Sequence, residues 1–155
     1  MRRGTGDAAA DAVTRFLVDE NVLRELHPKG HARVRAWYAS VSDAELRISV
    51  MTCFEKRRGW ERRRRSDPVL AASRLAELDA LEAAYGGRIV PIDAAVMAEW
   101  ARLLGVKDRN QRDRALAATA RVHGFVLVTR NIADFRGCEV RVLDPFAVRP
   151  VVRTV

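Results

Sequence analysis

The stretch FLVDENVLREL, residues 16–26, decides the fold of this chain. Its apolar run at residues 16–18 predicts a short buried strand, and the run stops abruptly at Asp19, Glu20 and Asn21. Two adjacent carboxylates at the end of a buried strand repel each other and lose hydration, which is unfavourable unless a positive group lies beside them. The stretch therefore predicts a sheet edge that carries a functional site, whose other residues lie elsewhere in the sequence.

Apolar runs and amphipathic segments alternate along the rest of the chain. Further strands are predicted at residues 46–50, 88–91, 125–129 and 140–143, the last of these being the final strand. Helices are predicted near residues 20–26 and over residues 31–41, 51–65, 68–85, 93–104 and 113–123, with Asp93 as a helix cap and His123-Gly124 as a helix end. This alternation is typical of an α/β domain in which helices flank a central parallel sheet.

The chain is predicted to form one domain over residues 16–146. Residues 1–15 mix Arg, Gly, Ala and Asp without a strong period and are expected to be a partly ordered extension, while residues 147–155 are expected to be a C-terminal tail. A chain of 155 residues buries enough apolar surface to fold without disulfides or metal. Cys53 and Cys138 are too few for a disulfide framework.

Charge and hydropathy restrict the partners of the chain. It carries 28 Lys and Arg against 20 Asp and Glu, and this net charge of +8 favours a polyanionic partner, which leaves nucleic acid, an acidic protein and an anionic membrane surface open. No apolar run approaches the roughly 20 residues that span a bilayer. The chain does not begin like a secretory signal peptide. We therefore expect a cytoplasmic protein that is not embedded in a membrane.

Four acids follow the predicted elements in a way that would bring them to one edge of the sheet. Asp19 follows the first strand and Glu55 lies one helical turn past the second, while Asp134 comes after the strand at 125–129 and Asp113 opens the preceding helix. Carboxylate oxygens are the ligands that Mg²⁺ and Mn²⁺ prefer, and such a site beside basic surface suits metal-assisted hydrolysis of a phosphodiester. Taken singly, each acid has a simpler explanation as a helix starter, a turn residue or a solvated helix acid.

Four segments of the sequence together resemble a known family. LVDENVLREL, TCFEKRRG, DRALAATARVHG and LVTRNIADF are similar, in order and spacing, to the motif blocks of PIN-domain ribonucleases, in particular the VapC and FitB-like toxins of bacterial toxin-antitoxin pairs. The resemblance runs from Phe16 to the region of Phe146 and implies a PIN-like, Rossmann-like domain of three layers. It also implies a pocket that holds Mg²⁺ or Mn²⁺ and cleaves RNA, formed by Asp19, Glu55, Asp113 and Asp134.

The same resemblance assigns supporting residues and shows one departure. Asn21, Thr129 and Asn131 match polar positions of the family and are expected to orient ligands and water. Glu20 stands where the family usually has Thr or Ser, and three outcomes are open: an additional metal ligand, a carboxylate that crowds the substrate phosphate, or a side chain that turns into water. Relatives commonly form homodimers that bind an antitoxin, so the resemblance implies both partners here.

The stretch KRRGWERRRR, residues 56–65, follows Glu55 on the same predicted helix and carries strong positive charge. Its arginines, in particular Arg57, Arg58 and Arg62, are candidates for contact with RNA or with an acidic antitoxin segment. The alternative is a solvated helix flank, which explains most runs of charge.

The leading interpretation is a metal-dependent endoribonuclease that acts as the toxin of a type II toxin-antitoxin pair. A second interpretation keeps the fold but makes the domain a catalytically weakened module that binds RNA or a protein partner, because Glu20 would repel the substrate phosphate. A third, a receiver-like phosphoacceptor, is weaker because the last strands lack the lysine that such domains place near their acids. The three histidines do not have the spacing of metal ligands and receive no role.

Overall fold

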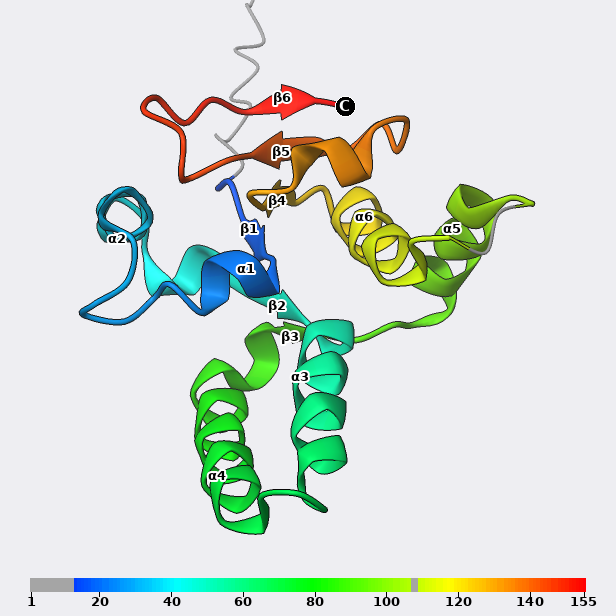
Figure 1. The fold of residues 1–155 in the computed structure, drawn as a ribbon. Coiled ribbons are helices and arrows are strands. Elements are labelled where there is room, and N and C mark those ends of the chain that lie inside the picture. Colours follow the sequence, from blue (N-terminus) through cyan, green and yellow to red (C-terminus); the bar gives the residue numbers. More distant parts are fainter. Residues whose placement is uncertain (1–12, 107–108) are drawn as a thin grey trace, which may run out of the picture.

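A six-stranded sheet lies at the centre of the computed structural model, which describes residues 13–106 and 109–155 (Figure 1). Its strands are β1 (Phe16–Val18), β2 (Leu46–Ser49), β3 (Ile89–Val90), β4 (Val126–Val128), β5 (Arg141–Leu143) and β6 (Arg153–Thr154), in the order β3-β2-β1-β4-β5-β6 across the sheet. Strands β1 to β5 run parallel to one another, and β6 runs antiparallel to β5. The predicted central parallel sheet is confirmed, apart from this last edge strand.

Helices connect the parallel strands. They are α1 (Glu20–Leu23), α2 (Ala32–Ala39), α3 (Val50–Arg63), α4 (Pro68–Tyr85), α5 (Ala94–Leu104) and α6 (Gln111–His123), with short 3₁₀ segments η1 (Asp43–Glu45), η2 (Gly86–Arg88) and η3 (Ile132–Phe135). Asp93 caps α5, because its side chain accepts a hydrogen bond from Val96 N at 2.9 Å. Gly124 ends α6 with a φ of 68°, a left-handed conformation that glycine adopts without strain. The predicted cap and the predicted helix end are both confirmed.

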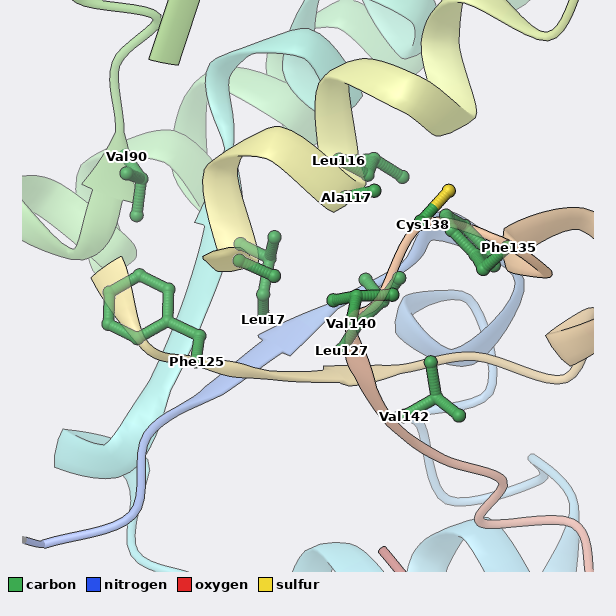
Figure 2. Close-up of a cluster of buried hydrophobic side chains, with 11 residues drawn as sticks. Leu17, Val90, Leu116, Ala117, Phe125, Leu127, Phe135, Cys138, Val140 and Val142 are labelled. Atoms are coloured by element: carbon green, nitrogen blue, oxygen red, sulfur yellow. The ribbon is translucent and has the colours of Figure 1, made fainter. Parts of the chain in front are cut away.

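Helices cover both faces of the sheet, as the alternation of side chains along the central strands requires. Leu17 of β1 and Leu127 of β4 belong to one buried cluster, where they pack with Leu116 of α6 and Phe135 of η3 (Figure 2). The neighbouring strand residues point into a second cluster, whose members include Val18, Val22, Val34, Trp37, Ile48, Val126 and Val128. This three-layer arrangement confirms the predicted fold class.

Ion pairs link two pairs of helices. The pair α3 and α4 projects away from the sheet (Figure 1), and Arg57 of α3 donates to Asp79 at 2.7 Å and to Glu82 at 2.8 Å on α4. Helices α5 and α6 pack side by side, and Arg121 of α6 donates to Glu99 of α5 at 2.6 Å. The basic helix α3 is therefore anchored at its middle to an acidic face of α4.

Strands β1 and β4 lie side by side in the middle of the sheet, and the order of the other strands runs outward from them in opposite directions. In an open parallel sheet such a reversal leaves a crevice at the carboxyl ends of the strands, where ligands bind. Asp19 and Thr129, the residues directly after β1 and β4, meet at this place. The backbone amide of Asp19 still donates to Val128 O at 2.9 Å, so the chain leaves β1 paired with β4.

Two expectations from the sequence are wrong in detail. The strand at 140–143 is not the last one, because the expected tail at 147–155 contains β6, and Val140 and Val155 exchange backbone hydrogen bonds at 3.1 and 3.0 Å. The residues of β6 are both exposed, so pairing with β5 and not burial holds this strand, and no apolar run marked it. The helix expected near residues 20–26 ends at Leu23.

The expected N-terminal extension is described only in part, since residues 1–12 lie outside the described residues. Within the described part, Arg15 already takes part in the sheet, because its carbonyl accepts a hydrogen bond from Val126 N at 3.0 Å. No helix of residues 13–106 and 109–155 combines the length and the apolar character needed to cross a membrane.

Candidate active site

Asp19 is the buried centre of the site. It is the first residue after β1, it is only 1% exposed, and its carboxylate caps the short helix α1 by accepting from Glu20 N at 2.7 Å. A buried carboxylate needs several donors to replace the water it has lost. Thr129 Oγ1 donates to Asp19 Oδ2 at 2.8 Å and Asn21 Nδ2 donates to the same oxygen at 3.3 Å. The polar residues after β1 and β4 thus supply part of the compensation that the buried carboxylate of Asp19 needs.

A small network fixes these donors in turn. Thr129 is fully buried, and its hydroxyl accepts from the backbone amide of Asn131 at 3.1 Å while it donates to Asp19. Asn21 contacts the same hydroxyl at 3.3 Å, and its own Oδ1 accepts from the backbone amide of Arg130 at 3.2 Å. Asn21 and Thr129 therefore both contact the carboxylate of Asp19 and each other. The contact that the structure gives Asn131 comes from its backbone and not from its side chain.

Arg112 supplies the positive group that the buried acids require. Its guanidinium lies 3.2 Å from Asp113 Oδ1 and 3.4 Å from Asp19 Oδ1, so one cation bridges both carboxylates. Asp113 stands in the first turn of α6, where the helix N-terminus also favours negative charge. The arginine thus brings together the first and third of the four predicted acids.

Burial and the neighbouring charges act in opposite directions on this pair. Burial raises the pKa of Asp113, and the attraction of Arg112 does not offset it, since Asp19 and Asp134 add repulsion. Burial also acts to lower the pKa of Arg112, but that pKa is raised because Asp19, Asp113 and Glu20 all attract its charge. Burial therefore disfavours the charged form of Asp113 even with Arg112 beside it.

Glu55 and Asp134 stand apart from this bridged pair. Glu55 of α3 has a side chain that is 37% exposed and pairs with Arg58 at 4.0 Å. Asp134 is exposed in η3, and its charge is felt at Asp113. Within the parts of the chain that the structure describes, no three acidic, histidine or cysteine side chains are gathered closely enough to enclose a metal ion. Of the four predicted acids, Asp19 and Asp113 thus share a contact with Arg112, and Asp134 is near enough to repel the charge of Asp113.

Glu20, the departure from the family pattern, turns toward the basic helix. Its carboxylate lies 3.5 Å from Lys56 Nζ of α3, and the two side chains are 29% and 24% exposed. The lysine partner was not among the three outcomes considered from the sequence, which remain predictions. The pairing reduces the repulsion that Glu20 would exert on a phosphate.

The candidate arginines of α3 divide into two kinds. Arg57 is occupied by Asp79 and Glu82, an arrangement that gives it a structural role between α3 and α4. Arg58 and Arg62 are exposed, and the pair of Arg58 with Glu55 is long at 4.0 Å. These two are better placed than Arg57 to meet a polyanion.

Sequence reasoning missed Arg112, Lys56 and Thr52. Two adjacent acids after a strand predict a positive side chain beside them. Nothing in the local sequence distinguishes Arg112 from the other arginines of the chain. Thr52 lies one turn before Glu55 on α3 and is 1% exposed, and its hydroxyl has no hydrogen-bond partner among the described residues. A buried hydroxyl without a partner costs about 1–3 kcal/mol, so this position has a reason to bind water or a ligand atom.

Comparison with known proteins gives the class of the chain. The profile of the PIN domain matches residues 16–136, so the chain belongs to the PIN-domain family. Its sequence is similar to that of Toxin FitB from Neisseria gonorrhoeae, with 29% identity over 137 residues that cover 84% of this chain and 98% of that protein. The predicted resemblance to PIN domains and to FitB-like toxins is therefore confirmed.

Solved structures agree with this assignment. The structure of FitAcB from Neisseria gonorrhoeae is similar with a TM-score of 0.63 and 27% identity, over 86% of this chain and 99% of that one. A toxin-antitoxin complex from Klebsiella pneumoniae gives a TM-score of 0.61 and 21% identity, over 87% of this chain and all (100%) of that one, and shows the fold alone. The fold is thus shared with these proteins over 86% and 87% of this chain.

Proposed function

We propose that this PIN domain is a metal-dependent endoribonuclease and acts as the toxin of a type II toxin-antitoxin pair. The observation that carries the proposal is the buried carboxylate of Asp19, held by Thr129 and Asn21 and joined to Asp113 by Arg112, at the carboxyl ends of β1 and β4. A site of this kind in a PIN domain has the donors for metal-assisted phosphodiester hydrolysis. The likeness to Toxin FitB supports the role as a toxin.

The residues present fit a hard divalent cation. Mg²⁺ is usually held by one or two carboxylates and keeps several of its waters, which matches the pair of Asp19 and Asp113. The space between these carboxylates already holds the positive charge of Arg112, so it suits a cation. We assign Asp19 and Asp113 as the direct ligands and Glu55 and Asp134 as groups that act through water. When bound, Mg²⁺ or Mn²⁺ would activate water and stabilise negative charge on the phosphate oxygens.

Other residues of the chain would orient the Asp19 carboxylate and attract RNA. Thr129 and Asn21 hold one oxygen of Asp19 in a fixed direction, and the other oxygen lies 3.4 Å from the Arg112 guanidinium. The net charge of +8 draws RNA to the protein, and Arg58 and Arg62 supply phosphate contacts on α3. Lys56 neutralises Glu20, so an incoming phosphate meets less repulsion.

The proposed partners are an antitoxin and a second copy of the chain. An acidic antitoxin segment has the charge to bind the arginines of α3, in competition with RNA. Size-exclusion chromatography with light scattering should give twice the monomer mass of 17.4 kDa for the toxin alone. A monomeric mass at working concentration would contradict the dimer without affecting the nuclease assignment. The proposed location is the cytoplasm.

The test of the nuclease is cleavage of a mixed RNA substrate with Mg²⁺ or Mn²⁺, with chelator, and with Asp113→Asn. We expect cleavage that requires both the ion and Asp113. Glu77→Gln is the matched control, because it changes an exposed acid of α4 whose ion pair, with Arg74, lies within its own helix. Cleavage that persists unchanged in Asp113→Asn would sink the assignment.

The second candidate is an RNA- or protein-binding domain without hydrolysis. The presence of Glu20 in place of Thr or Ser and the absence of a ready group of three acids in the described residues favour it. A Glu20→Thr variant separates the two: gain of cleavage by an otherwise inactive protein would show that Glu20 suppresses the reaction.

A further inference from the structure

The carboxylate of Asp19 has no free acceptor position. A carboxylate offers about four lone-pair sites, and four donors occupy those of Asp19. They are Glu20 N at 2.7 Å and Arg112 Nη2 at 3.4 Å on Oδ1, and Thr129 Oγ1 at 2.8 Å and Asn21 Nδ2 at 3.3 Å on Oδ2. A divalent cation therefore reaches Asp19 only when one of these donors leaves.

Arg112 is the donor that leaves at the lowest cost. Its contact with Asp19 is the longest of the four, and its side chain is 34% exposed, whereas that of Asp19 is 1% exposed. The backbone amide that Asp19 caps is fixed in α1, and the hydroxyl of Thr129 is fully buried. Asn21 is held at its other end by the backbone amide of Arg130. The guanidinium therefore has the longest contact and a partly exposed side chain, whereas Asn21, also partly exposed, is tied to the backbone after β4.

The departing arginine would free both proposed ligands at once, since the same guanidinium meets Asp113 Oδ1 at 3.2 Å. We propose that Arg112 is an internal counter-ion, which holds Asp19 and Asp113 together in the metal-free protein and competes with the divalent ion for them. This rests on the proposed function, because it concerns the same two carboxylates. Arg112 is thus a positioning residue, and the affinity of the site for metal includes the cost of displacing it.

The test is Mn²⁺ binding by isothermal titration calorimetry in the absence of RNA. Arg112→Gln should bind Mn²⁺ about tenfold more tightly, because the ion no longer displaces a charged hydrogen bond of the usual strength. Arg112→Lys should lie between this variant and the native protein, since an ammonium ion does not match two carboxylates as a guanidinium does. Equal or weaker Mn²⁺ binding by Arg112→Gln would overturn the proposal.

Arg130→Gln is the matched control. It removes one positive charge next to the site, but the Arg130 side chain lies over the Phe146 ring at 4.8 Å. The gain in affinity should be clearly larger for Arg112→Gln than for Arg130→Gln. An equal gain in both variants would mean that general charge, and not direct competition, sets the affinity, and would also overturn the proposal.

Asp113→Asn distinguishes this proposal from the proposed function. If Asp113→Asn binds Mn²⁺ as the native protein does, the ion lies elsewhere and both proposals fail. If Asp113→Asn loses binding while Arg112→Gln is unchanged, only the role of Arg112 fails. Thermal melting gives an independent reading: Arg112→Gln should melt lower than the native protein without metal and should gain more from added Mn²⁺. If Arg112→Gln does not fold without metal, Arg112→Lys decides, and its failure to bind Mn²⁺ more tightly than the native protein would overturn the proposal.

Discussion

Thr129 joins the two halves of the site through a single oxygen atom. Its hydroxyl donates to Asp19 after β1 and accepts from the backbone of Asn131 after β4. The distance in sequence between Thr129 and Asp19 is 110 residues, so no local pattern shows this contact. Family resemblance marks Thr129 as a polar position of the last motif, but its work as a buried donor becomes visible only when β1 and β4 are paired.

Loss of the Thr129 hydroxyl should lower the stability of the fold. Thr129→Val keeps the shape of the side chain but leaves a buried carboxylate oxygen with one donor fewer, so we expect the free energy of unfolding in urea to fall by about 2 kcal/mol. Thr119→Val is the control, because Thr119 is equally buried but its hydroxyl donates to the neutral carbonyl of Ala115. Its loss should be about 1 kcal/mol. Equal losses of unfolding free energy in the two variants would show that the hydrogen bond to Asp19 stabilises the fold no more than an ordinary one.

The acids of the site were easier to predict than their cation. Asp19 and Asp113 were expected to converge because strand ends and helix starts of an α/β sheet share one edge. Arg112 was not singled out, since an arginine in a polar stretch before a helix has no distinguishing neighbour. The direction of a long side chain depends on tertiary contacts, and 28 Lys and Arg residues offer too many choices.

At the scale of elements, the arginines of α3 differ in their surroundings. Arg57 is bound to α4, and the hydrogen bonds that it donates to Asp79 and Glu82 raise its pKa, whereas Arg62 is exposed. We expect Arg57→Gln to lower the melting temperature with little change in RNA binding, and Arg62→Gln to weaken RNA binding at an unchanged melting temperature. Fluorescence anisotropy with an RNA probe and thermal melting measure both quantities. The reverse result would assign Arg57 to RNA and contradict the division.

The contact between α5 and α6 should depend on pH. Hydrogen bonds from Arg102 and Arg121 lower the pKa of Glu99 from 4.5 to about 2. A lowered pKa contributes stability that is fully present above pH 4.5 and is lost as the pH falls toward 2. The difference in melting temperature between native protein and Glu99→Gln should therefore be largest near neutral pH and should shrink in acid. A difference that stays constant with pH would contradict this role of Glu99.

Elements with a buried face were predictable, and β6 was not. The strands of the two central clusters are apolar runs, and the helices between them carry caps and apolar faces that mark their positions. Strand β6 has two exposed residues and exists through its backbone pairing with β5. Pairing of this kind leaves no side-chain pattern, so the C-terminal residues were expected to be a tail.

At the scale of the whole molecule, charge should govern RNA affinity. Each phosphate contact to single-stranded RNA lowers the slope of log K against log salt by about 0.7. The Asp113→Asn variant allows binding to be measured without cleavage, and Arg58→Gln in that background should reduce the magnitude of the slope. Binding that is independent of salt would contradict a polyanion-binding role for the net charge of +8.

The central pairing of β1 with β4 also has a consequence for biosynthesis. The first strand leaves the ribosome early, but its neighbour β4 and the hydroxyl of Thr129 follow 110 residues later. At about 5–20 residues per second, the growing chain carries an unfinished sheet centre for many seconds. Asp19 has none of its partners from α6 or β4 during that time. The carboxyl-end site of this sheet is therefore incomplete until the residues of α6 and β4 have left the ribosome.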